Sequence, residues 1–106
     1  MDELRAQWLH LTRDVLPARA RAEGWRLRFD HCFMRVVLDQ VAQRRWDEII
    51  DRPAVRAMTA SQLREAIRLA ERLAAEGAGL LEAWDDESLA WRGAAPRQRR
   101  PDPGHR

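Results

Sequence analysis

The sequence is poor in the residues that build disulfides and metal sites. Its 106 residues include one cysteine and three histidines, and lysine and tyrosine are absent. Cys32 alone cannot form an intramolecular disulfide, and the histidines show no metal-ligand spacing with it or with one another. The sequence therefore predicts neither a disulfide framework nor a metal site. Because alanine is abundant and every basic residue other than histidine is arginine, we attribute the arginine excess to codon bias and give it no functional weight.

Long hydrophobic runs are absent as well. No apolar stretch approaches the roughly 18 residues that a membrane span needs. The N-terminus, Met-Asp-Glu-Leu-Arg, lacks the basic-then-apolar order of a signal peptide. We therefore expect a cytoplasmic protein that makes no membrane contact, and we expect no cofactor.

The charge is distributed unevenly along the chain. The formal net charge is +2, but residues 92–106 hold five arginines and one aspartate, so residues 1–91 are mildly acidic. Residues 94–106 contain three prolines and no large apolar residue, and we predict that they form a disordered basic tail. Arg97, Arg99 and Arg100 are candidates for contact with nucleic acid or an acidic partner, although three arginines at a chain end are more typical of a solubilising extension.

The N-terminal segment has the periodicity of an amphipathic helix. Its apolar stripe consists of Leu4, Trp8, Leu11 and Val15. Pro17 either ends this helix or opens a second short one, and Gly24 supplies the left-handed position that commonly closes a helix. Residues 25–29 then alternate apolar and cationic side chains, but no second strand-like run exists to pair with them. We interpret these residues as an extended linker that places on the core the side chains of Trp25, Leu27 and Phe29.

A central helix is predicted after this linker, with Asp30 as its N-cap. One arc of the helix is apolar and consists of Phe33, Met34, Val37, Leu38 and Val41. A separate polar stripe consists of His31, Arg35, Asp39 and Gln43. Val36, Val37 and Val41 are β-branched and lower the intrinsic helix propensity of this segment. The stability of this helix must therefore come from burial.

The second half of the chain contains the clearest helical pattern. Thr59 and Gln62 resemble a capping box, and the helix they begin should end near Gly77. Its apolar face consists of Leu63, Ala66, Ile67, Ala70, Leu73 and Ala74. Short helical turns are expected at 46–50 and 53–58. We interpret residues 79–84 and 88–91 as a further turn and a closing segment, with Asp85 as an N-cap between them.

Together these patterns predict an all-α fold. Residues 1–93 should form a single domain, a small irregular or orthogonal bundle of three main helices with several short helices.

The densest group of chemically capable side chains lies at the start of the central helix. It consists of Asp30, His31, Cys32, Arg35 and Asp39. A thiol in the first turn of a helix can be activated by the macrodipole, which favours a reactive Cys32. The alternative is structural: Asp30 caps the helix, Cys32 is a buried filler, Arg35 pairs with Asp39, and His31 is half exposed. The sequence favours this structural interpretation, because no glycine pattern that could form an oxyanion hole accompanies the thiol of Cys32.

Three tryptophans are predicted at helix ends, namely Trp46, Trp84 and Trp91. There an indole either covers the edge of the core or lines a surface for a partner, and covering the core edge is the more common role. The neighbouring acidic run, Asp85-Asp86-Glu87, lacks the spacing of a calcium loop and suits a helix N-terminus.

Several motifs over residues 4–93 resemble a family of small bacterial and fungal proteins of uncharacterised activity. The most specific is Asp30-His31-Cys32-Phe33-x-Arg35-x-x-Leu38-Asp39. The others are Trp8-Leu9-x-Leu11-Thr12, Gly24-Trp25, Trp46, Arg52-Pro53-Ala54 and Ser88-Leu89-Ala90-Trp91-Arg92-Gly93. Members often carry a label that relates them to GNAT-type N-acetyltransferases, which implies acyl-group chemistry. Gly77-Ala78-Gly79 matches only the end of the acetyl-CoA pyrophosphate loop, so no acetyltransferase residue is carried over to this chain.

Two functional hypotheses follow from these features. The first is a small helical binding module with a protein partner. It is favoured because the sequence has a full set of apolar core positions and no complete set of catalytic residues. The second is a small enzyme or ligand-binding domain that uses the group at 30–39. A pocket at the start of the central helix, together with an activated Cys32 thiol, would favour the second hypothesis. A flat apolar patch around Trp46, Trp84 or Trp91 would favour the first.

Overall fold

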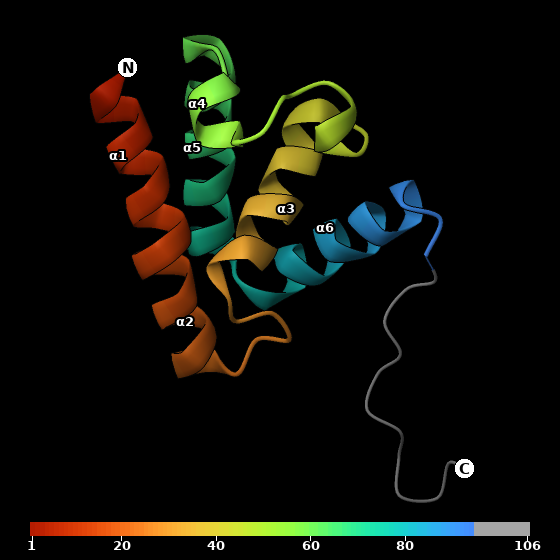
Figure 1. The fold of residues 1–106 in the computed structure, drawn as a ribbon. Helices are drawn as coiled ribbons and strands as arrows, with labels where there is room; N and C mark the ends of the chain where they lie inside the picture. The colour runs from red at the N-terminus through yellow and green to blue at the C-terminus, as the bar shows by residue number, and fades with distance from the viewer. Residues whose placement is uncertain (95–106) are drawn as a thin grey trace, which may run out of the picture.

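A computed structural model, which describes residues 1–94, shows an all-α protein (Figure 1). The described part contains helices, short loops and no strand. In chain order the elements are α1 (Asp2–His10), the π-helix η1 (Leu11–Val15), α2 (Leu16–Glu23), α3 (Asp30–Ala42), the 3-10 turn η2 (Trp46–Glu48), α4 (Ala54–Ala57), α5 (Ala60–Glu76) and α6 (Ala78–Trp91). The predicted irregular helical bundle is confirmed.

Elements α1, η1 and α2 run on as one rod (Figure 1). The wide turn of η1 holds one residue more than an α-helical turn, so the buried stripe advances by one position along the rod. Leu16 is therefore fully buried, and the predicted Val15 is only half-buried. Pro17 lies in the first turn of α2, directly after η1, and the rod continues past it, while Gly24 ends the helix at φ 69° as predicted.

The linker after Gly24 carries two of its three predicted anchors into the core. Trp25 and Leu27 are buried, but the prediction for Phe29 was wrong, since 65% of it is exposed. Phe29 stacks on the ring of His31 at the surface, with 5.8 Å between the ring centroids. Phe29 is also the residue that precedes α3. Asp30 is the first helical residue rather than the N-cap, and its carboxylate accepts a hydrogen bond from the His31 N–H.

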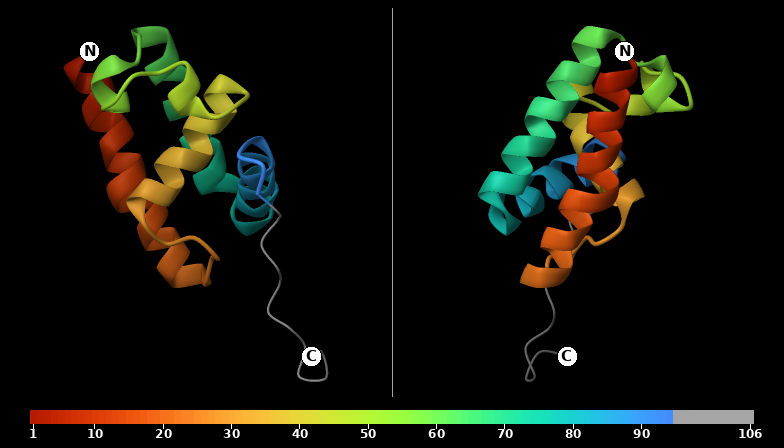
Figure 2. Two further views of the ribbon diagram at one scale, coloured as in Figure 1. Left: turned by 45° about the vertical axis from the view of Figure 1, so that its right-hand side comes forward. Right: turned by 90° about the vertical axis from the view of Figure 1, so that its left-hand side faces the viewer.

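Helix α5 forms as its sequence predicts. Thr59 and Gln62 make both hydrogen bonds of a capping box, and Gly77 ends the helix. The predicted apolar face is buried, except that Ala74 is half-buried. This face packs against α1 on one side and α3 on the other, which makes α5 the centre of the hydrophobic core (Figure 2).

The last element departs from the prediction. Residues 78–91 form one continuous helix, α6, so separate segments at 79–84 and 88–91 were a wrong interpretation. Asp85 lies in the middle of this helix and is fully buried, so it is no N-cap, and the acidic run does not mark a helix N-terminus. Helix α6 lies across α3 and packs against it (Figure 2).

Some expectations fall at the edge of what the structure describes. The tail segment 95–106, with Arg97, Arg99 and Arg100, lies outside the described residues. Within residues 1–94, no helix combines the length and apolar character needed to cross a membrane. In the same range, no group of three or more His, Cys, Asp or Glu side chains is arranged to hold a metal ion.

The packing of α5 and α3 yields a first prediction. Leu63→Ala and Phe33→Ala should each lower the free energy of unfolding by about 2–5 kcal/mol, because each leaves a cavity in the core. Denaturant-induced unfolding followed by circular dichroism measures this loss. Arg64→Ala, at an exposed position next to Leu63, is the control and should change the stability by less than about 0.5 kcal/mol. Wild-type stability of both core variants would contradict the helix packing described here.

Candidate functional site

Helices α3 and α6 enclose a group of buried polar side chains. Asp39 on α3 and Asp85 and Ser88 on α6 are all fully buried. Burying a carboxylate is costly unless cations and hydrogen bonds compensate its charge. Three arginines supply that compensation: Arg26 from the linker, Arg35 from α3, and Arg92 directly after α6.

Asp39 connects three segments of the chain. Its Oδ2 accepts hydrogen bonds from the Ser88 hydroxyl and from Nη1 of Arg92. Its Oδ1 accepts one from the backbone N–H of Trp46, at 2.9 Å. One carboxylate therefore holds the end of α6 and the start of η2 against α3.

Asp85 and Ser88 complete the network. Nη2 of Arg35 donates to Oδ1 of Asp85 at 2.8 Å, and Nη1 of Arg35 donates to the Ser88 hydroxyl oxygen at 2.5 Å. Nη1 of Arg92 donates to the same hydroxyl oxygen at 3.1 Å. The Ser88 hydroxyl thus donates one hydrogen bond and accepts two, which is its full capacity. Arg26 approaches the other oxygen of Asp85 at 3.5 Å and also pairs with Glu82 and Asp86.

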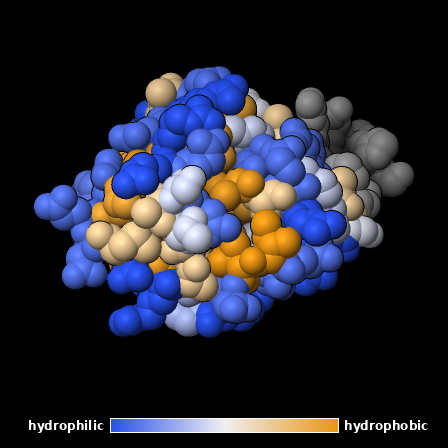
Figure 3. All heavy atoms as spheres, turned by 90° about the horizontal axis from the view of Figure 1, so that it is seen from above, coloured by the Kyte–Doolittle hydropathy of each residue, from blue (hydrophilic) through white to orange (hydrophobic). Residues whose placement is uncertain are grey.

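A groove of about 720 Å³ lies in front of this network. Its walls come from α1, η1, the first three turns of α3, and the chain from Trp46 to Val55. The apolar side chains that line it include Leu9, Met34, Leu38, Trp46 and Val55. Seen from the end of the molecule that carries the N-terminus, apolar residues gather in the middle of the surface and hydrophilic residues border them (Figure 3).

The polar residues that line the groove are cationic or ionisable to a cation. They are Arg13, His31, Arg35, Arg52 and Arg92. None of the described lining residues is an aspartate or glutamate. The carboxylates that pair with these arginines, such as Asp39 and Asp85, lie behind them and outside the lining.

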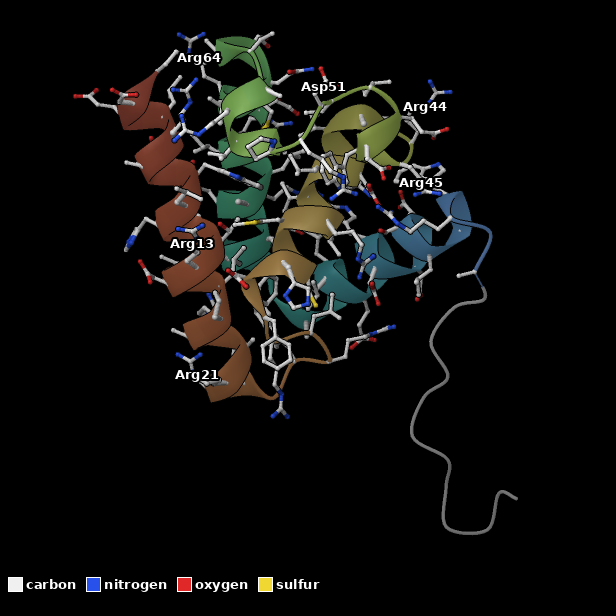
Figure 4. All side chains as sticks on the ribbon, in the orientation of Figure 1. Arg13, Arg21, Arg44, Arg45, Asp51 and Arg64 are labelled. Atoms are coloured by element: carbon white, nitrogen blue, oxygen red, sulfur yellow. The ribbon has the colours of Figure 1, made fainter. Side chains whose placement is uncertain are left out.

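Arg52 and Arg13 form the outer rim of the groove. Arg52 lies over the ring of Trp46, with 4.9 Å between its guanidinium carbon and the ring centroid. It also pairs with Asp47, whose pKa is lowered, mainly by hydrogen bonds from Arg45 and to a smaller extent by Arg52. Nε of Arg13 lies 3.9 Å from Oδ2 of Asp30. Arg13 comes from the helical rod, and Arg45 lies beyond the end of α3 (Figure 4).

The structure separates the residues predicted as one cluster. His31 and Arg35 line the groove, but Asp30, Cys32 and Asp39 do not. The predicted pairing of Arg35 with Asp39 was wrong, because Arg35 bonds to Asp85 and Ser88 instead. Two predicted exposures differ as well. The His31 side chain is 77% exposed rather than half exposed, and Cys32 is half-buried rather than buried.

The three tryptophans proposed as a partner surface do not share one face. Trp84 is buried in the core, in the middle of α6. Trp46 is half-buried and lines the groove, while Trp91 is half-buried at the end of α6. A continuous tryptophan patch is therefore absent from the described part of the chain, and Trp46 is the member that belongs to the site.

Sequence reasoning missed Arg26, Asp85, Ser88 and Arg92 as site residues. The signal was present, because Asp85, Ser88 and Arg92 are spaced as one stripe on a helix. Dividing residues 79–91 into two segments hid that stripe.

No family model, curated protein or solved structure matches this chain.

The buried network yields a second prediction. Asp85→Asn should lower the free energy of unfolding by about 3–5 kcal/mol, because Arg35 loses the buried carboxylate that balances its charge. Asp86→Asn is the matched control: Asp86 is the next residue, is 45% exposed and pairs only with Arg26 among the described residues, so its loss should cost less than about 1 kcal/mol. Thermal and denaturant unfolding of the two variants measure the difference. Equal stabilities would show that the network does not hold α6 in place.

Proposed function

We propose that this chain is a small ligand-binding domain and that the groove between the rod, α3 and the 46–55 segment is its binding site. The observation that carries the proposal is the groove itself, which combines an apolar lining with a cationic rim. Its volume of about 720 Å³ suits a small molecule with an apolar body. Small-molecule sites commonly occupy roughly 300–1,000 Å³ and are lined mainly by apolar side chains.

Preorganised walls support this proposal. Trp8 and Leu38 are buried core residues that also line the groove, so their side chains are fixed by packing on the other side. Arg35 and Arg92 are fixed by hydrogen bonds to buried acceptors. A site whose walls are already ordered loses little conformational entropy when a ligand binds.

The composition of the lining supports binding over catalysis. Acyl transfer requires a nucleophile or a general base beside the substrate. The described groove lining contains no Ser, Thr, Cys, Asp or Glu side chain, and Cys32 lies outside it. His31 is the one imidazole in this lining, and its exposed ring stacks on Phe29. The same surface is available to an apolar segment of a protein partner, which the sequence led us to expect.

The third prediction tests the groove with octan-1-ol as a neutral apolar probe. Titration of the full chain with octan-1-ol should shift the NMR resonance of the Trp46 indole N–H. Ala54→Phe should weaken this binding at least about tenfold, because the new ring fills the apolar space that the probe occupies. The control is Ala57→Phe, which adds the same ring to an exposed position of α4 outside the groove.

Ala57→Phe should bind octan-1-ol as the wild type does. Failure of the wild type to bind octan-1-ol, or equal binding by Ala54→Phe, would overturn the proposal of a small apolar ligand.

A further inference from the structure

We infer that the ligand of the groove is a monocarboxylate with an apolar body, and that Arg35 and Arg92 bind its carboxylate together. This inference rests on the proposed function and adds the chemical class of the ligand. It starts from the position of the two guanidinium groups, which donate hydrogen bonds to one and the same oxygen, the hydroxyl of Ser88. The two cations are therefore held within a few ångströms of each other at the wall of the groove.

Both guanidinium groups are reachable from the groove. Each side chain is 20% exposed, and each lines the groove, while Asp39 and Asp85 are fully buried behind them. Within residues 1–94, the hydrogen bonds of Arg92 run through its Nη1. Its Nε and Nη2 are donors of the planar fork that a carboxylate accepts in bidentate fashion.

Charge balance favours a single negative charge over a phosphate dianion. Asp39 and Asp85 already offset much of the charge of Arg35 and Arg92. The remaining positive field comes from Arg13 and Arg52 at the rim, whose side chains are 58% and 71% exposed. The carboxylate nearest Arg13 is that of Asp30, which is partly exposed to solvent, and Arg52 shares the carboxylate of Asp47 with Arg45. A screened rim of this kind attracts an anion and holds it weakly unless a direct hydrogen bond forms at the wall.

The apolar lining determines the rest of the ligand. Leu9 and Val55 offer no hydrogen bond from their side chains, and the thioether of Met34 is only a weak acceptor, so the body of the ligand must be apolar. A ligand with its carboxylate at Arg35 and Arg92 would lie along these side chains, toward α1 and α4. The combination of one anionic end with one apolar body is the chemistry of a medium-chain fatty acid or an aryl carboxylic acid.

The test compares three probes of equal chain length on the full chain at pH 7: octanoate, octan-1-ol and octylammonium. Dissociation constants come from NMR titration of the Trp46 indole resonance. Octanoate should bind at least about tenfold more tightly than octan-1-ol, because charge-assisted bidentate hydrogen bonds add to the apolar contact. Octylammonium should bind more weakly than both. This comparison needs no variant, so it does not depend on the folding of a mutant.

Variants then locate the carboxylate. Arg92→Gln should weaken octanoate binding at least about tenfold, and the ratio of octanoate to octan-1-ol affinity should fall toward one. Arg52→Gln, at the exposed rim, should weaken octanoate binding only about two- to threefold. The control is Arg44→Gln, which removes the same charge from a side chain that points away from the body of the protein and does not line the groove (Figure 4).

The outcomes separate this inference from the proposed function. Equal affinities for octanoate and octan-1-ol, or tight octanoate binding that survives Arg92→Gln, would overturn the carboxylate site and leave the apolar groove in place. Failure of all three probes to bind would overturn the proposed function itself.

Discussion

The burial of two carboxylates, Asp39 and Asp85, between α3 and α6 is the constraint on which the rest of this structure depends. Neither charge can lie in a helix interface without cations around it, so the chain must bring Arg26, Arg35 and Arg92 to that point. This requirement fixes the position of α6 along α3 more narrowly than apolar packing alone would. It also sets the start of η2, because the Trp46 N–H donates to Asp39.

The groove follows from the same arrangement. The rod and α3 both pack on α5, and the segment from Trp46 to Val55 bridges the space between them. Since Asp39 holds one end of this segment and Arg5 bonds the carbonyl of Val55 at the other, the segment stays at the mouth of the groove rather than collapsing into it. The apolar lining is therefore kept open by polar contacts at its edges.

Most of the helices could be predicted from the sequence, but most of the site could not. The capping box at Thr59 and the stop at Gly24 are local signals, and they were interpreted correctly. Asp39 was assigned to a polar stripe because it follows Arg35 by four residues on the same helix face, yet it is fully buried among Ser88, Arg92 and Trp46. Periodicity reveals which residues share a face of a helix, but it does not reveal whether another helix covers a polar face. That information depends on contacts such as Arg92 with Asp39, which are more than 50 residues apart in the sequence.

A polar helix interface of this kind is hard to explain by stability alone. Replacing a buried ion-pair network with apolar side chains of similar volume is often neutral or stabilising in proteins. An apolar α3–α6 interface would not place two guanidinium groups at the wall of the groove. What the network adds is position: it holds two cations side by side, partly exposed, and backed by acceptors that leave little freedom to the side chains. Fixed cations beside an apolar surface favour recognition of an anion, so the proposed binding role gives a reason for the desolvation cost of the network.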